Sequence, residues 1–398
     1  MRIAPISLRS LPSLLFLCMF AVACSGGGGD DDDGDIPDGG AGGGVVSTSQ
    51  FVVSAVTDSD GRALATIGIP AGIARYSITA QSSAPFIRTE HVVSGDVVYL
   101  NISGEFISLA TEFQNVLGTV NVPSRDFDPS ARSGPVDVIV TAASDATETG
   151  FTPAAQVQVD FVVTTKSDPD LRSGTLALNV FRVGDAAVTA DAAAAIESAI
   201  TRMEDIYRDQ AGITVQTEVF DLAGPEKLPF PFEGGELYLS SSQGARTPAV
   251  NIFVGAEIDL DVGFGTLLGV AASIPGPSHP TTKSAVAVSL VGNAGPDGVF
   301  SESERRILGE TFAHESGHFL GLFHPIELDG LIGFFASGED SLTDTETCAI
   351  IFECIENENL AHNLMFPTPL PAEDGGTIPQ DRLTSQQRGV LNLNAIVN

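Results

Sequence analysis

The residues with the clearest chemical potential lie in one short run, where His314, Glu315, His318, Gly321 and His324 follow the spacing HExxHxxGxxH. Two histidines four positions apart on a helix share one face, so both imidazoles can bind one metal ion at about 2.0–2.1 Å. Gly321 can adopt the positive φ that turns the chain at the end of a helix. The turn would return His324 to the metal as the third ligand.

This ligand set predicts a catalytic zinc site. Three neutral imidazoles leave a fourth position for water, whereas structural zinc sites are closed by four protein ligands. Zinc lowers the pKa of its bound water, and Glu315 can accept the proton of that water as it attacks a polarised carbonyl. Histidine is scarce, with 6 in the chain, and three of them stand in this run. We therefore expect His314, His318 and His324 to be zinc ligands and Glu315 to be the general base.

The extended motif resembles the signature of the metzincin zinc endopeptidases, in which a methionine turn follows the third histidine. Of the 4 methionines, only Met365 lies downstream of the motif. The resemblance implies that Met365 packs beneath the zinc ligands without binding the metal. The segment from Asp340 to Met365 is similar to the pappalysin-like branch, and the end of the motif is similar to serralysin-like members. Many relatives carry Tyr two residues after the methionine, and Pro367 stands there instead.

The second half of the chain contains the elements that must position these residues. Apolar residues at helical spacing predict a helix that begins after Thr189 and ends at Gly212. A capping box of Ser301 and Glu304 begins the helix that carries the motif. A further helix is expected from Leu383. Runs of apolar and β-branched residues predict strands at 175–181, 213–220, 249–254 and 285–291.

The first half has a different pattern, because short alternating runs are separated by turns. The clearest strands are expected at 51–53, 97–100, 136–140 and 157–163, without helical periodicity between them. We therefore expect an α+β protein: a β-sandwich-like domain over 46–166, and a metzincin-like zinc peptidase domain over 173–398. The second domain would contain a twisted sheet, an active-site helix and the methionine turn. Substrate-pocket residues are expected from 366–371 and from the loop after His324.

The N-terminus is typical of an exported lipoprotein. Residues 1–23 combine a positive start with a short apolar run, and the small residues before Cys24 resemble the lipobox of bacterial lipoproteins. Cys24 would then carry the lipid, and the Gly- and Asp-rich segment 24–45 would be a flexible tether. The alternative is an ordinary signal peptide cut at Ala23. The first interpretation predicts a lipid-anchored, surface-facing protein of the bacterial cell envelope.

Cys348 and Cys354 are the two cysteines that remain beyond the lipobox, among 4 in the chain. An even pair in an exported protein favours a disulfide. Two free thiols or two metal ligands are the alternatives, and no histidine or second cysteine pair stands at zinc-site spacing around them.

An acidic cluster follows the third histidine. Oxygen ligands at this density suit Ca²⁺, and pappalysin-like relatives bind calcium nearby. A solvated acidic loop is an equal alternative in so acidic a chain. The residues are Asp329, Glu339, Asp340, Asp344 and Glu346.

Charge and composition limit the partners. The 51 acidic and 19 basic residues give a net charge of -32, which argues against nucleic-acid binding, because that needs a basic surface. The partners expected are protein or peptide substrates, with the membrane contacted only through the lipid. The alternative function is a lipid-anchored binding or adhesion protein with a non-catalytic zinc site. The sequence leaves open whether the β-domain is a propeptide or a recognition module, but residues 25–173 contain no cysteine that could block the zinc.

Overall fold

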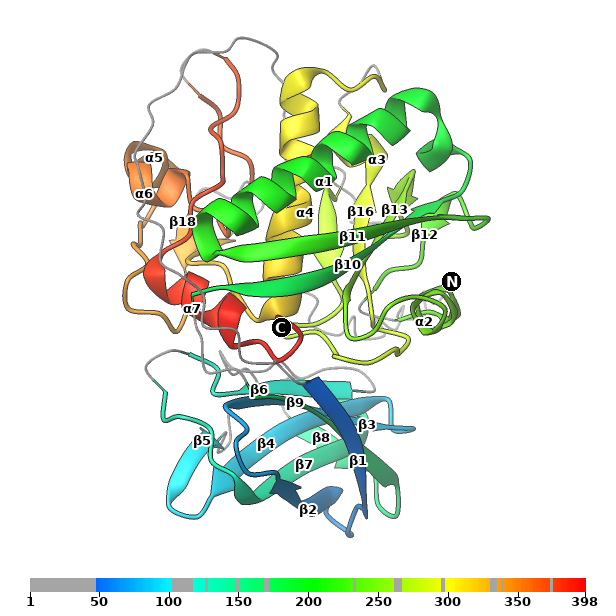
Figure 1. Ribbon diagram of the computed structural model, residues 1–398, viewed down its shortest axis with the longest axis vertical. Coiled ribbons are helices and arrows are strands. Elements are labelled where there is room, and N and C mark those ends of the chain that lie inside the picture. The colour runs from blue at the N-terminus through cyan, green and yellow to red at the C-terminus, as the bar shows by residue number, and fades with distance from the viewer. Residues whose placement is uncertain are drawn as a thin grey trace, which may run out of the picture.

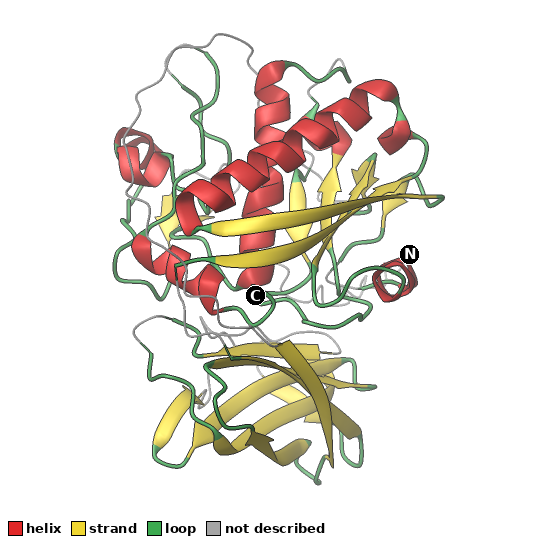
Figure 2. Cartoon of the chain, in the orientation of Figure 1, coloured by secondary structure: helices red, strands yellow, loops and turns green. Residues whose placement is uncertain are grey.

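The computed structural model describes residues 48–101, 117–125, 128–147, 150–167, 172–231, 234–260, 267–294, 298–329, 335–337, 340–372 and 375–398. They form a mixed α+β structure in which a smaller all-β body lies against a larger body with helices and strands (Figures 1 and 2). The expected signal peptide, Cys24 and the tether lie outside the described residues. Within the described part of the chain, no helix is long and apolar enough to cross a membrane.

The smaller body contains nine strands among the residues described: β1 (Thr48–Val56), β2 (Arg62–Ile69), β3 (Arg75–Ser82), β4 (Phe86–Ser94), β5 (Val97–Asn101), β6 (Leu117–Val122), β7 (Gly134–Thr147), β8 (Gly150–Pro153) and β9 (Gln158–Lys166). They pair into two sheets, of order β1-β9-β3-β6 and β2-β7-β4-β5, with β8 beside β7. Alternate residues of the two sheets, such as Ile78 and Val138, meet in one buried core. The four clearest predicted strands correspond to β1, β5, β7 and β9, although the last was predicted to begin one residue earlier, at 157.

A five-stranded sheet forms the centre of the larger body: β10 (Gly174–Val183), β11 (Ile213–Leu222), β13 (Val250–Gly255), β15 (Gly269–Ala271) and β16 (Val286–Ser289). The order is β11-β10-β13-β16-β15, and only β15 runs antiparallel to its neighbour. All four strands predicted here are present, but the strand predicted at 285–291 ends at Ser289, where the helix α3 (Leu290–Asn293) begins. The edge strand β15 was not predicted, because three small or branched residues carry no periodic signal. Two short pairs complete the strands: β12 (Lys227–Leu228) with β14 (Glu257–Ile258), and β17 (Glu327–Asp329) with β18 (Phe335–Ser337).

Two long helices pack on this sheet, α1 (Ala190–Ala211) and α4 (Glu302–Leu320). The side chain of Thr189 caps α1, and Gly212 ends it in the left-handed region at φ 66°, as predicted. The capping box that begins α4 is formed by Ser301 and Glu304, as predicted. The shorter helices are η1 (Ala186–Val188), α2 (Glu236–Gln243), α3 (Leu290–Asn293), α5 (Ile351–Glu356), α6 (Glu358–Ala361) and α7 (Ser385–Leu393).

The crossing of α1 and α4 fixes the helix that carries the histidines. A Cβ atom built on Gly309 lies 2.5 Å from Cβ of Arg202 and 3.1 Å from the carbonyl oxygen of Ala199, so the two helices approach at a glycine. The buried hydroxyl of Tyr207 donates a hydrogen bond to the carbonyl oxygen of Ala313 at 2.9 Å. These contacts fix the position of α4 along its axis and its rotation about that axis, relative to α1.

We expect Gly309→Ala to destabilise the protein by about 1–3 kcal/mol, because the added methyl group overpacks the crossing. Helix propensity alone would favour alanine by about 1 kcal/mol, so the sign of the change is informative. Urea unfolding measures it, with Gly68→Ala as the control, because a Cβ on Gly68 meets nothing within 4 Å. A Gly309→Ala protein more stable than wild type would show that the helices do not cross this closely.

Candidate metal centre

The structure brings together the three histidines that the motif predicts. Nε2 of His324 lies 3.1 Å from Nε2 of His314 and 3.0 Å from Nε2 of His318. One ligand atom from each residue lies within 4.8 Å of the others. Nitrogens that bind one tetrahedral ion at 2.0–2.1 Å stand about 3.3 Å apart. The spacing of the three Nε2 atoms therefore fits a single metal ion, and the triad could bind one.

Hydrogen bonds on the far side of each ring determine which nitrogen faces the others. Nδ1 of His314 donates to the carbonyl oxygen of Leu364 at 2.7 Å, and Nδ1 of His318 donates to that of Leu322 at 2.7 Å. Nδ1 of His324 lies 2.8 Å from a carboxylate oxygen of Glu327. In the neutral imidazoles these bonds place the proton on Nδ1 and leave each Nε2 unprotonated. Three lone pairs then converge on one point, which a cation would stabilise.

Burial keeps two of these rings neutral. It lowers the pKa of His314 to about 3, with a further decrease from the nearby His324, while the bond to the Leu364 carbonyl opposes the shift. Burial likewise lowers the pKa of His318 well below 6.5. Metal binding needs the neutral form of imidazole, so the protein environment favours the form that binds.

The turn after α4 and the predicted methionine complete the base of the site. Gly321 ends α4 at φ 116°, in the left-handed region that favours glycine, as predicted. Met365 is fully buried. Its Sδ would be 2.8 Å from a Cβ built on Gly317, so the methionine packs directly on the helix between the two ligand turns. Gly317 was not identified from the sequence, although its place between His314 and His318 makes a close approach there reasonable.

Glu315 is buried, and its carboxylate is held against the edge strand β15. The N–H of Ala271 donates a hydrogen bond to it, and burial nevertheless raises the pKa of Glu315 to about 7, while His324 and the Ala271 bond oppose the increase. A Cβ built on Gly269 would lie 2.7 Å from Cγ of Glu315 and 2.9 Å from Cγ2 of Thr311. The carboxylate can occupy this place only because residue 269 has no side chain.

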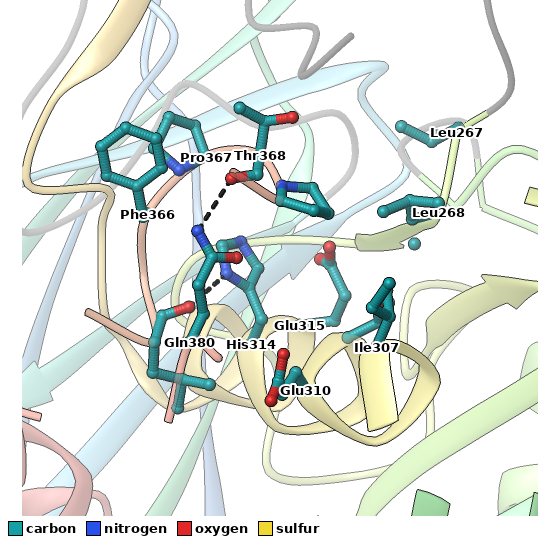
Figure 3. A pocket seen from close by; sticks show the side chains of 14 residues that line it. Leu267, Leu268, Ile307, Glu310, His314, Glu315, Phe366, Pro367, Thr368 and Gln380 are labelled. Carbon is teal, nitrogen blue, oxygen red and sulfur yellow. Dashed lines mark hydrogen bonds between the residues drawn. The ribbon is translucent and has the colours of Figure 1, made fainter. Parts of the chain in front are cut away.

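A cavity of about 60 Å³ adjoins His314 and Glu315. Figure 3 shows these two side chains projecting from α4 on the same side, with Phe366 and Pro367 across from Leu268. The cavity is lined by Leu267, Leu268, Gly269, Ile307, Glu310, Thr311, His314, Glu315, Leu364, Phe366, Pro367, Thr368, Pro369 and Gln380. The predicted segment 366–371 thus contributes to its wall. The described part of the loop after His324 does not, and the contribution of β15 was not foreseen.

A network of ion pairs fixes one end of this wall. Glu310 pairs with Arg306 at 2.9 Å and with Arg202 of α1 at 3.1 Å. Arg202 also pairs with Asp381, and Arg306 donates to the carbonyl oxygen of Thr377 at 2.8 Å. Burial raises the pKa of Glu310, and the two arginines oppose that increase. Glu310 stands one helical turn before His314, a spacing from which its place in the cavity could have been predicted.

Cys348 and Cys354 are paired at disulfide distance, with 5.3 Å between their Cα atoms, which confirms the predicted pair. The pair lies beside α5 and α6, in a small apolar cluster that includes Phe366 and Leu370. The disulfide therefore shares an apolar cluster with Phe366, which lines the cavity.

The acidic residues considered for calcium do not gather around one point in the described part of the chain. Asp340 accepts hydrogen bonds from its own turn, Asp344 from the first turn of α7, and Glu346 from two asparagine side chains near α6. Glu339 and the side chain of Asp329 lie outside the described residues. Among the residues that are described, the histidine triad is the one group of three or more with metal-ligand spacing.

We expect Glu327→Gln to weaken zinc affinity about 10- to 100-fold, because the carboxylate orients His324 and increases the basicity of its Nε2. The amide keeps a hydrogen-bond acceptor of the same size but removes the charge. Competition with a chromogenic chelator measures the affinity. Glu346→Gln is the control, because Glu346 is bound to asparagines away from the triad. Equal affinities of wild type and Glu327→Gln would show that the carboxylate has no part in metal binding.

The comparisons with known proteins give structural neighbours alone. No family model matches this chain, and no curated protein matches it in sequence. It is similar to metalloproteinase-II from Bacteroides fragilis, at 14% identity and a TM-score of 0.32, over 59% of this chain and 62% of that one. It is also similar to a chain in the structure of a chaperone–substrate complex, at 16% identity and a TM-score of 0.29, over 56% of this chain and 34% of that one. A metalloproteinase is thus among its structural neighbours, and the chain spans less than two thirds of either one.

Proposed function

We propose that this protein is a zinc-dependent endopeptidase of the metzincin type. The observation that carries the proposal is the convergence of the three Nε2 atoms beside the buried carboxyl group of Glu315, at the wall of a cavity. We further propose that a lipid on Cys24 holds the protein at the bacterial cell envelope, facing outward. Its substrates are then proteins or peptides outside the cell.

Several features around the histidines support the metzincin assignment. The active-site helix ends at Gly321, the third histidine follows the turn, and Met365 packs against the helix between the first two histidines. The one antiparallel strand of the central sheet, β15, borders the cavity. Pro367 stands where many relatives carry Tyr, so this chain works without that hydroxyl group.

The reaction would divide the work between the metal and Glu315. Zinc held by the three histidines would supply the positive charge that acidifies a water molecule and polarises the scissile carbonyl. Glu315 accepts the proton of the attacking water and passes it to the leaving amine. Burial makes Glu315 a stronger base than a solvated glutamate, because it raises the pKa of the carboxyl group. The N–H of Ala271 keeps the carboxylate at one place beside the triad.

The cavity favours substrates with an apolar side chain beside the scissile bond. Most of its wall is apolar, including Leu267, Leu268 and Ile307 on one side and Phe366 on the other. Glu310, which lines one end of the cavity, is already paired with Arg306 and Arg202. A charged substrate side chain would lose its hydration there without gaining a partner.

Replacement of Glu315 tests the proposal directly. We expect Glu315→Gln to keep bound zinc and to lower kcat on protein or peptide substrates about 100- to 10,000-fold, because the general base is lost. His318→Ala should lose both zinc and activity, since it removes a ligand. Zinc content and cleavage of a peptide library are the two measurements. Bound zinc without cleavage of any peptide by wild type would favour the alternative, a binding protein with a non-catalytic metal.

We expect Gly269→Ala to keep zinc but to lower kcat about 10- to 100-fold, because its methyl group displaces the Glu315 carboxylate by a fraction of an ångström or more. The same change in a Glu315→Gln background should cost much less, since the base that the methyl group displaces is already lost there. A double-mutant cycle on kcat measures this non-additivity. Equal losses in both backgrounds would show that Gly269 acts elsewhere.

A further inference from the structure

The sheet β1-β9-β3-β6 of the sandwich has one polar side that is nevertheless buried. Its register pairs Gln50 with Thr164, Thr164 with Ser77, and Ser77 with Asn121, so these four residues form one row across the four strands. Successive residues of a strand face opposite sides, and the neighbouring Val163 belongs to the sandwich core. Ser77, Thr164 and Asn121 are 1%, 0% and 5% exposed, so another body must cover them, whereas Gln50 at the end of the row is exposed.

The larger body covers this row with two of its segments. Nε2 of Gln50 donates to the carbonyl oxygen of Ser278 at 2.9 Å, and the hydroxyl of Thr164 is hydrogen bonded to that of Ser278. At the other end of the row, Nδ2 of Asn121 donates to the carbonyl oxygen of Leu320 at 3.4 Å. Leu320 is the last residue of α4, the helix that carries His314 and His318.

A second row of residues fixes the orientation of the sandwich against the larger body. Arg75 is paired with Lys166 in the same register. The pair lies two residues along the strands from Ser77 and Thr164, and therefore on the same side of the sheet. The guanidinium of Arg75 donates to the carbonyl oxygen of Asn392, and the ammonium of Lys166 donates to that of Val397. Both charged side chains are almost fully buried. A buried charge is strongly destabilising unless its hydrogen-bond geometry is met, so these bonds permit one orientation of the sandwich.

The contacts converge on the turn that leads to the third histidine. The carbonyl oxygen of Leu320 accepts a second amide hydrogen bond, from Nδ2 of Asn394 at 2.9 Å. A Cβ built on Gly321 would lie 3.4 Å from Nδ2 of Asn121. The sandwich and the C-terminal segment therefore hold the end of α4 between them, immediately before the chain turns toward His324.

The sandwich lies away from the cavity. None of its described residues lines the cavity beside the triad. Figure 1 shows the sandwich below the lower end of α4 and next to α7, with β6 and β9 on the side that faces the larger body. A propeptide that blocked the site would instead have to reach the cavity beside His314 and Glu315.

We infer that the sandwich is a permanent support of the metal centre and that Asn121 is a positioning residue for His324, an inference that rests on the proposed zinc site. Asn121 acts through the carbonyl of Leu320 and the backbone of Gly321. The sandwich then belongs to the working enzyme and is not a propeptide to be removed.

The test uses the full chain with two changes in the sandwich. Ser77→Arg places a long charged side chain in the middle of the buried row and should separate the two bodies without touching the sandwich core. Asn121→Ala removes one amide at the Leu320 carbonyl. Thr66→Arg is the matched control, because Thr66 is exposed on β2 in the other sheet. Chelator competition gives the Co²⁺ affinity, the visible absorption of bound Co²⁺ reports ligand geometry, and thermal unfolding establishes that each variant is folded.

We expect Ser77→Arg to weaken Co²⁺ binding at least about 10-fold and to alter its absorption spectrum. Asn121→Ala should weaken binding about 3- to 10-fold, the range expected for one lost hydrogen bond, and Thr66→Arg should match wild type. If Ser77→Arg does not fold, Asn121→Ala decides alone. Wild-type affinity and spectrum in folded Asn121→Ala would overturn the inference while leaving the zinc site intact. A wild-type protein that binds neither Co²⁺ nor Zn²⁺ would overturn the proposed function itself.

Discussion

The convergence of three imidazole Nε2 atoms is the constraint on which the rest of the larger body depends. Each ring donates its Nδ1 proton outward, to a carbonyl oxygen or to the carboxylate of Glu327, so the inward nitrogens present lone pairs to one another. Lone pairs at this separation repel unless a cation lies between them. The fold must therefore hold His314, His318 and His324 against that repulsion whenever metal is absent, and the packing around α4 provides the rigidity.

That rigidity comes from parts of the chain far apart in sequence. The close crossing at Gly309 fixes α4 against α1. Arg306 of α4 also donates a hydrogen bond to the carbonyl oxygen of Thr377, in the segment behind the cavity wall. Met365 packs on the helix from below. The amides of Asn121 and Asn394 hold the carbonyl at its last residue. Five separate segments thus determine where one helix stands.

The sequence was sufficient to predict the features that depend on neighbouring residues in the chain. The spacing of the histidines gave the triad, the Ser301 capping box gave the start of α4, and Gly321 gave its end. Runs of β-branched residues located the long strands. The role of Gly269 and the row of Ser77, Thr164 and Asn121 that contacts the larger body could not be found in this way. Each depends on a contact with a residue that is distant in the chain. A local sequence pattern does not show which distant side chain packs against a given glycine.

The coordination of Zn²⁺ added to the purified protein tests the central claim most directly. X-ray absorption at the zinc edge separates nitrogen from sulfur neighbours and measures their distances. We predict three imidazole nitrogens at about 2.0–2.1 Å and one further oxygen neighbour. A sulfur neighbour at about 2.3 Å, or fewer than three imidazoles in a fully loaded sample, would contradict this prediction.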